Sequence, residues 1–258
     1  MEVLVHTLSR RSLLGGLACV AASRPLAAAT EKLSVEVGDG RVALSRYASA
    51  HAGKRPAVLL LHGSRGFDLR LPAYERYANA LTADGIDAYL VRYYTPADEH
   101  AFETLHTRES REAYETGRFE AWAGRVSSVL TAVLAGADSS GRIGLLGFSL
   151  GGYVAAAAAA RDARVSALAV LYGGMPEKIA PDVKHLPPLI ELHGEADRNV
   201  PLASGEALVK LGKAVGAPAE FVKYPGKAHG FDFADNDPMT ADAISRVIGF
   251  FQSRLTAA

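Results

Sequence analysis

The sequence predicts a three-layer α/β domain, built on a mostly parallel, twisted sheet of about eight strands with helices on both faces. Two observations lead to this fold class. Short apolar runs recur along the chain, and longer segments with apolar residues at three- and four-residue spacing separate them. Because continuous apolar runs are typical of strands buried on both faces, the sheet is expected to be mainly parallel.

The first predicted element is a hairpin at the edge of the sheet. Residues 32–37 and 41–47 are β-prone, and Gly38-Asp39-Gly40 between them has the composition of a hairpin turn. The other predicted strands are residues 57–62, 87–94, 142–148, 166–172, 188–193 and 219–224. The predicted helices are residues 71–83, 119–135, 150–161, 204–215 and 238–255. Residues 96–117 are polar and predict a surface insertion with some helix.

The first 29 residues resemble an export signal. Arg10 and Arg11 precede an apolar run of small residues, and Ala27 to Ala29 provide a site for cleavage. Paired arginines at this position are similar to the twin-arginine type of signal. We expect cleavage after Ala29, export to a bacterial periplasm and a domain spanning residues 30–258. The alternative is an N-terminal amphipathic helix packed on the domain.

Composition narrows the classes of ligand. Lysine plus arginine and aspartate plus glutamate number 28 each, so no basic field is available to hold a nucleic acid. A small or neutral ligand is expected, and no apolar run after the N-terminal segment is long enough to span a membrane. The only cysteine, Cys19, lies in the predicted signal, where a lipid-bearing role after Leu17-Ala18 is an alternative. If the signal is cleaved, the mature domain contains no cysteine and therefore no disulfide.

The candidate nucleophile is Ser149. It is the serine of G-F-S-L-G, Gly147 to Gly151, between an apolar strand and an Ala-rich helix. A G-x-S-x-G motif in this context places its serine on a tight strand-to-helix turn, where the glycines let strand and helix approach closely. The N–H of Leu150, at the start of the helix, would stabilise a developing anion. The alternative is that Ser149 only caps the helix.

A serine nucleophile needs a base, and the loops after parallel strands are where a base and its partner should meet the serine. Asp197 follows the strand ending near residue 193, and His229 follows the last strand. Their other possible roles are an Asx turn for Asp197 and a plain surface position for His229. The chain order Ser149, Asp197, His229 predicts a triad in which Asp197 orients His229. Glu195 is the alternative acid.

Two histidines and one turn remain at the strand ends. His62 and His193 each end a predicted strand, and structural roles are preferred for them because His229 is available as the base. The turn after His62 is expected to donate the second oxyanion hydrogen bond, from the N–H of Ser64 or, alternatively, Gly63. No set of residues has the spacing of a zinc site, so no metal is expected.

The chain resembles the dienelactone hydrolase family of the α/β-hydrolase fold. The motifs that carry the resemblance are L-L-L-H-G-S-R-G, G-F-S-L-G-G-Y, H-G-E-A-D-R-N-V-P and Y-P-G-K-A-H-G-F, which span nearly all of the predicted domain. The resemblance implies a cofactor-free hydrolase that acts on an ester or lactone through an acyl-enzyme, with Asp197 as the acid. A peptidase or amidase on the same fold, or a non-catalytic binding protein, are the alternatives.

Departures from the family pattern make dienelactone itself doubtful as the substrate. Enzymes of the family's eponymous activity have cysteine at the position of Ser149 and glutamate at that of Gly63, and their carboxylate-binding arginines have only Arg65, Arg70 and Arg92 as candidate counterparts. Aromatic residues in or beside the polar insertion are expected to pack in the core, with a wall of the substrate pocket as the alternative. They are Tyr93, Tyr94, Phe102, Tyr114, Phe119 and Trp122.

Overall fold

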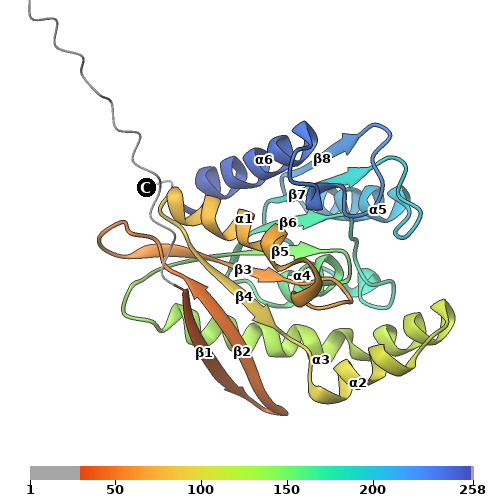
Figure 1. Ribbon diagram of the computed structural model, residues 1–258, viewed down its shortest axis with the longest axis horizontal. Coiled ribbons are helices and arrows are strands. Elements are labelled where there is room, and N and C mark those ends of the chain that lie inside the picture. The colour runs from red at the N-terminus through yellow and green to blue at the C-terminus, as the bar shows by residue number, and fades with distance from the viewer. Residues whose placement is uncertain (1–29, 257–258) are drawn as a thin grey trace, which may run out of the picture.

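A computed structural model of the protein describes residues 30–256 (Figure 1). Within this range an eight-stranded sheet has the order β1-β2-β4-β3-β5-β6-β7-β8. The β1–β2 and β2–β4 pairs are antiparallel, and all other neighbouring pairs are parallel. The strands are β1 (Thr30–Val37), β2 (Gly40–Tyr47), β3 (Arg55–Leu61), β4 (Asp87–Arg92), β5 (Ser139–Phe148), β6 (Val165–Leu171), β7 (Leu189–Gly194) and β8 (Ala219–Tyr224). The predicted fold class and edge hairpin are therefore confirmed.

The predicted export signal and Cys19 lie outside the described residues, and that expectation stays a prediction.

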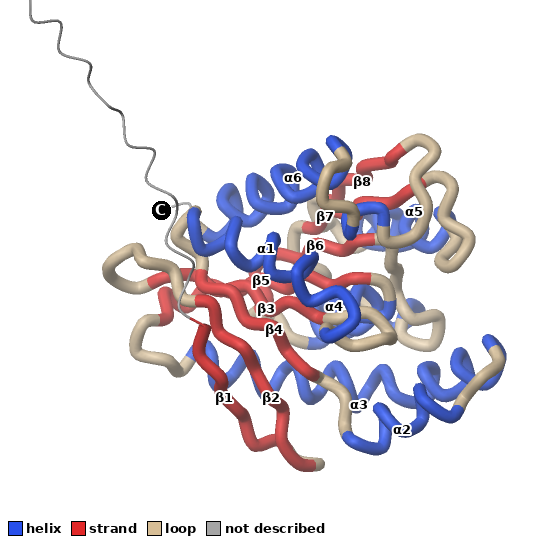
Figure 2. The backbone as a smooth tube through the Cα atoms, viewed as in Figure 1, coloured by secondary structure: helices blue, strands red, loops and turns tan. Residues whose placement is uncertain are grey.

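Helices cover both faces of the sheet (Figure 2). They are α1 (Leu71–Ala83), α2 (Pro96–Thr104), α3 (Arg108–Leu134), α4 (Leu150–Arg161), α5 (Leu202–Ala214) and α6 (Pro238–Leu255). Side chains alternate between the two faces of a strand, and β3 shows this in its core contacts. Leu59 and Leu61 pack with residues of α3, α4 and α5, whereas Val58 and Leu60 pack with residues of α1 and α6. Two hydrophobic cores thus hold the three layers together.

The polar insertion is more helical than the sequence suggested. Helix α3 begins at Arg108, whereas the spacing of apolar residues predicted a start at Phe119. Hydrogen bonds that hydropathy does not report stabilise the added turns. Thr107 caps the helix by accepting from the N–H of Ser110, and the fully buried carboxylate of Asp98 on α2 accepts hydrogen bonds from α3.

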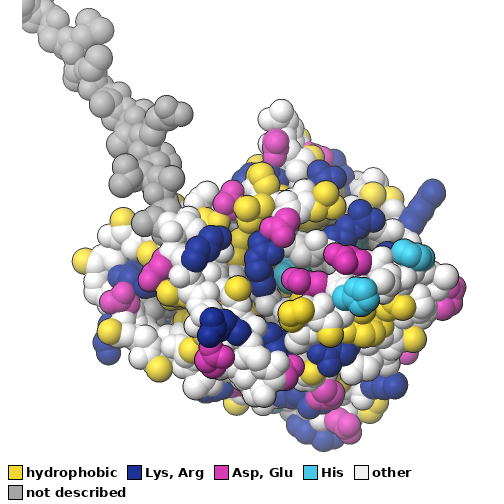
Figure 3. All heavy atoms as spheres, turned by 60° about the horizontal axis from the view of Figure 1, so that its bottom comes forward, with side chains coloured by type: hydrophobic (Ala, Val, Ile, Leu, Met, Phe, Trp, Pro, Cys, Tyr) yellow, Lys and Arg dark blue, Asp and Glu magenta, His cyan; other side chains and the backbone are white. Residues whose placement is uncertain are grey.

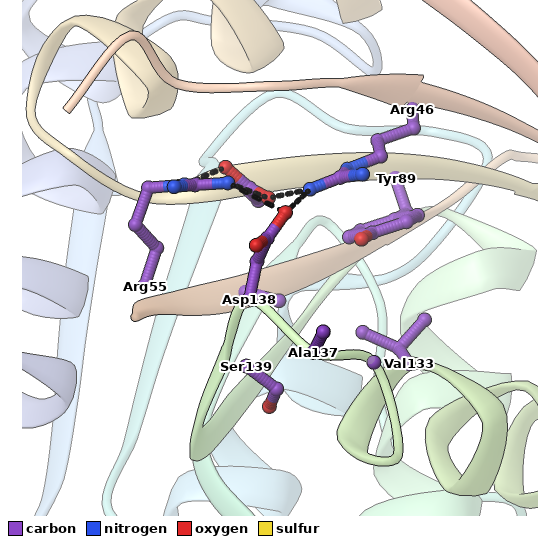
Figure 4. A pocket seen from close by; sticks show the side chains of 10 residues that line it. Arg46, Arg55, Tyr89, Val133, Ala137, Asp138 and Ser139 are labelled. Atoms are coloured by element: carbon purple, nitrogen blue, oxygen red, sulfur yellow. Dashed lines mark hydrogen bonds and ion pairs between the residues drawn. The ribbon is translucent and has the colours of Figure 1, made fainter. Parts of the chain in front are cut away.

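An ion-pair cluster ties together the start of three strands and the edge hairpin (Figure 4). Asp87 accepts from Arg46 at 2.8 Å and from Arg55 at 2.9 Å, and both arginines also contact Asp138. Burial alone would raise the pKa of Asp87, but the two arginines hold it below its usual value. The cluster borders a cavity of about 70 Å³ near the first residues of β3, β4 and β5. These residues lie at the strand ends opposite the edge that carries Ser149.

The surface carries both signs of charge. On the face shown in Figure 3, basic and acidic side chains are interspersed and no large patch of one sign is visible. Among residues 30–256, no helix combines the length and the apolar composition needed to cross a membrane.

Candidate active site

Ser149 lies on a sharp turn between β5 and α4. Its φ of 54° is in the left-handed region, which non-glycine residues seldom adopt, so the turn holds the serine under backbone strain. A Cβ at Gly147 would lie 2.2 Å from the carbonyl oxygen of Gly151, and a Cβ at Gly151 would lie 2.3 Å from that of Leu61. The glycines of the motif are thus required by the close approach of strand and helix, as the sequence predicted.

The structure brings together the three predicted triad residues. His229 Nε2 lies 2.9 Å from Ser149 Oγ, and His229 Nδ1 lies 2.7 Å from Asp197 Oδ2. Because a carboxylate only accepts hydrogen bonds, Nδ1 carries the proton and Nε2 is free to accept from the serine hydroxyl. The three side chains come from the loops after β5, β7 and β8, at the carboxyl ends of the parallel strands.

Asp197 uses its two oxygens for different purposes. Oδ1 accepts from the N–H groups of Asn199 at 2.8 Å and Val200 at 2.9 Å, which forms the Asx turn considered for this residue, while Oδ2 faces His229. Burial alone would raise the pKa of Asp197, but hydrogen bonds from His193 and His229 hold it below its usual range. The carboxylate is therefore oriented by its own loop and stays ionised. Glu195, the alternative acid, is exposed.

The turn after β3, which contains the predicted oxyanion donor Ser64, lies beside Ser149. The Cβ of Ser149 would be 3.4 Å from a Cβ built on Gly63, so the turn after β3 adjoins the nucleophile. The N–H of Gly63 already donates to the hydroxyl of Tyr74 at 3.3 Å. Within the described part of the chain, the N–H groups of Leu150 and Ser64 have no such protein acceptor. They are accordingly better available than Gly63 to bind an oxyanion.

His62 is part of an aromatic cluster rather than of the triad. Its ring stacks on Tyr93 with centroids 4.2 Å apart and meets Phe67 and Tyr94 edge-on. Burial lowers the pKa of His62 to about 4, so the ring is neutral near pH 7, and its Nδ1 donates to the carbonyl of Gly63 at 2.8 Å. This contact holds the turn that carries the predicted oxyanion donor, Ser64. The remaining aromatic residues of the insertion also pack ring against ring, as expected for a core role: Tyr94, Phe102, Tyr114, Phe119 and Trp122.

The three candidate carboxylate-binding arginines have different surroundings. Arg92 forms an ion pair with Asp68 at 2.6 Å, and the guanidinium of Arg70 lies 5.9 Å from the ring centroid of Phe233. Arg65 is exposed, next to Ser64. Two of the three candidates, Arg70 and Arg92, thus have contacts of their own with protein side chains.

Two groups near the triad were not found by sequence reasoning. Tyr172 has a φ of 43°, and its ring lies edge-on to His229 with centroids 4.6 Å apart. Its hydroxyl and that of Tyr77 donate to Asp232, a fully buried carboxylate three residues after His229. Burial raises the pKa of Asp232. These contacts support the loop of His229, and only the acid in H-G-F-D gave a sequence signal for them.

Glu191 is the second group, and it lies in the middle of β7. Its side chain is fully buried and its Oε1 lies 2.8 Å from His193 Nδ1. The visible signal was an acidic residue in the otherwise apolar strand P-L-I-E-L-H. His193 Nε2 lies 3.1 Å from the carbonyl of Val200, so His193 does hold the loop of Asp197, the kind of structural role expected for it.

The sheet order and the turn that carries Ser149 between β5 and α4 are those of the α/β-hydrolase fold. A sequence model described as the dienelactone hydrolase family matches residues 42–255. The chain belongs to this family, which confirms the resemblance seen in its four motifs.

Similar proteins agree with this assignment. A protein of Methylorubrum extorquens described as "Putative carboxymethylenebutenolidase" is 31% identical over 123 residues, a match that covers only 42% of this chain and 42% of that relative. The crystal structure of dienelactone hydrolase from Anabaena variabilis has a TM-score of 0.71 at 21% identity and covers 89% of this chain and 100% of that one. An acylaminoacyl peptidase of Pyrococcus horikoshii has a TM-score of 0.70 at 15% identity, covering 91% of this chain and 43% of that one. At these identities the two structures show a shared fold.

Proposed function

We propose that the protein is a serine hydrolase that cleaves a carboxylic ester or lactone through an acyl-enzyme intermediate. The observation that carries this proposal is the hydrogen-bonded series from Ser149 Oγ through His229 to the buried carboxylate of Asp197, with distances of 2.9 and 2.7 Å. Such a series matches the geometric requirement for an activated serine. The name of the Methylorubrum relative supports an ester or lactone rather than a peptide bond.

In the proposed reaction, Ser149 Oγ attacks the acyl carbonyl while its proton passes to His229 Nε2. Asp197 fixes the tautomer of His229 and stabilises the imidazolium that forms. The carbonyl oxygen becomes an oxyanion and accepts from the N–H groups of Leu150 and Ser64. The intermediate collapses when the carbon–oxygen bond to the leaving alcohol breaks and His229 returns the proton to that oxygen.

Water completes the cycle. His229 takes a proton from a water molecule as its oxygen attacks the acyl carbon of the ester formed with Ser149. The second tetrahedral intermediate releases the carboxylic acid and restores the serine hydroxyl. In a lactone, the leaving alcohol stays tethered to the acyl group, so the product is one hydroxy acid.

The test is hydrolysis of p-nitrophenyl acetate and butyrate by the protein and by Ser149→Ala. The variant should lose at least about a thousandfold in kcat, because no other group replaces the nucleophile. Circular dichroism and thermal unfolding check that the variant folds. The same pair of proteins assayed on acyl p-nitroanilides distinguishes ester from amide cleavage. Equal esterase activity in both proteins would refute the mechanism.

A further inference from the structure

Strand β7 carries two buried ionisable side chains on one of its faces. Glu191 and His193 are two residues apart, so they point to the same side of the sheet, and both side chains are fully buried. A Cβ at Gly205 on α5 would lie 2.6 Å from Glu191 Oε1 and 2.9 Å from His193 Nδ1. The helix over this face thus has a glycine where any side chain would collide with the pair. Buried ionisable groups are costly, so their accommodation calls for a specific role.

The pair reaches the triad through the acid. His193 Nε2 lies 3.4 Å from Asp197 Oδ2, the same oxygen that accepts from His229 Nδ1 at 2.7 Å. It also lies 3.1 Å from the carbonyl oxygen of Val200. Because both groups only accept hydrogen bonds, Nε2 must carry a proton. A continuous series therefore runs from Glu191 through His193, Asp197 and His229 to Ser149.

His193 carries one proton on Nε2, and the position of a second proton, between His193 and Glu191, decides the charge on each of the two side chains. One proton lies between Glu191 Oε1 and His193 Nδ1, which are 2.8 Å apart. If it resides on His193, the ring is a cation between two carboxylates. Burial alone would lower the pKa of His193, but hydrogen bonds to Asp197 and Glu191 outweigh burial and raise it. Burial raises the pKa of Glu191 to about 7, and the hydrogen bonds from His193 and from the N–H of Gly173, at 3.3 Å, oppose this and favour the ionised carboxylate.

One further cation, Lys223 of β8, lies next to the pair in register with His193, and a carboxylate of its own holds it. Helix α5 presents Gly205, and α4 presents the half-buried phenol of Tyr153. Strand β8 presents the ring of Phe221, with its centroid 6.5 Å from that of His193. It also presents Lys223, which forms an ion pair with Glu206 at 2.6 Å. His229 lies beyond Asp197. The charge next to Asp197 therefore depends on His193 and on the carboxylate that pairs with it.

We propose that Glu191 and His193 are positioning residues that keep a proton on His193 against Asp197, and that this charge limits how strongly Asp197 stabilises the imidazolium of His229. The inference rests on the proposed function. Its physical content is that a cation beside Asp197 partly neutralises the carboxylate, so Asp197 attracts the imidazolium of the reaction less strongly than an isolated aspartate would. The serine would then have a free base over a wider range of acidic pH.

The critical variant is Glu191→Gln, measured by kcat/KM for p-nitrophenyl butyrate across pH 5 to 9. The glutamine amide can donate to His193 Nδ1, which keeps the ring in place but leaves it neutral. Activity on the acid limb should then reach half its plateau at a pH about one unit higher than in the parent protein. A merely structural role would lower kcat without moving this midpoint.

The matched control is Glu195→Gln, which removes an exposed carboxylate two residues from Asp197 and should leave the midpoint unchanged. An unshifted midpoint in Glu191→Gln would overturn the inference while leaving the proposed function intact. Retained activity in Ser149→Ala would instead overturn the proposed function itself.

A second measurement on the parent protein does not depend on a variant folding. Nitrogen-15 spectra of histidine-labelled protein report which ring nitrogens are protonated. The inference requires that the buried His193 ring be protonated at both nitrogens at pH 7 and lose a proton only at higher pH. One unprotonated nitrogen in that ring at pH 7 would contradict it.

Discussion

Replacing Asp197 with asparagine should disable the base while preserving the fold. The substitution is nearly isosteric, and the two oxygens of the carboxylate decide how the amide will sit. At the position of Oδ1 two backbone N–H groups, those of Asn199 and Val200, need an acceptor at 2.8 and 2.9 Å. The amide oxygen must therefore occupy that position, because an NH₂ group there would face two donors.

This orientation places the NH₂ group of the new side chain against His229 Nδ1, where the parent carboxylate accepts at 2.7 Å. His229 can accept from the amide only in the tautomer that carries its proton on Nε2. That proton points at Ser149 Oγ, so the ring can no longer take the serine proton. A tautomer error of this kind in a serine protease triad reduces kcat about 10⁴-fold, which corresponds to roughly 5.5 kcal/mol of transition-state free energy.

The assay is steady-state hydrolysis of p-nitrophenyl butyrate by Asp197→Asn and the parent protein at pH 7.5, with thermal unfolding measured in parallel. We expect a loss of about 10⁴ in kcat with a small change in KM, since the site that holds the acyl group is untouched. A kcat within tenfold of the parent value, in a variant that folds, would refute the tautomer argument. It would also reopen the question of which acid orients His229.

Two further predictions concern stability. Gly151→Ala should prevent folding or destabilise by more than about 3 kcal/mol in urea titrations, because its Cβ would lie 2.3 Å from a backbone oxygen that cannot move without distorting β3; unchanged stability would show that the elbow is looser than described. Asp98→Asn should cost about 2 kcal/mol at pH 7, because it removes the charge that pairs with Arg118 at 2.8 Å. Burial alone would raise the pKa of Asp98, yet the hydrogen bond from Arg118 holds it below its usual value, so this stability is present above the unfolded-state pKa and is lost as the pH falls. The difference between variant and parent should therefore shrink as the pH falls below about 4, and a difference as large at pH 2 as at pH 7 would contradict this origin.

The fold was largely predictable because its signals are local and periodic. Each parallel strand is an apolar run, and Gly38-Asp39-Gly40 marks the edge hairpin directly. The start of α3 was not predictable in the same way. Its first turns carry no apolar stripe, and they depend on the cap at Thr107 and on contacts with Asp98, a residue of another helix. Such contacts exist only once the chain has folded.

The candidate site likewise has a part that the sequence predicts and a part that depends on contacts formed only in the folded chain. Ser149, Asp197 and His229 follow strands of one sheet, so topology alone predicts that they meet. The network behind them could not be predicted, because Tyr172, Asp232 and Glu191 act through contacts between distant segments. The visible signals were the acid in H-G-F-D for Asp232 and, for Glu191, an acid between apolar residues of a strand.

Backbone strain points to the same site. Among residues 30–256, the non-glycine residues with positive φ are Ser149 at 54° and Tyr172 at 43°, and both contact His229 from different strand ends. Strain of this kind costs of order 1–3 kcal/mol per residue and persists only where the surroundings enforce it. At Ser149 close backbone packing enforces it, and at Tyr172 the hydroxyl is held by Asp232 at 2.8 Å. Glu191 is buried on the neighbouring strand β7. These three departures from local preference therefore lie around one imidazole, as expected where a fold gives up stability to position a functional side chain.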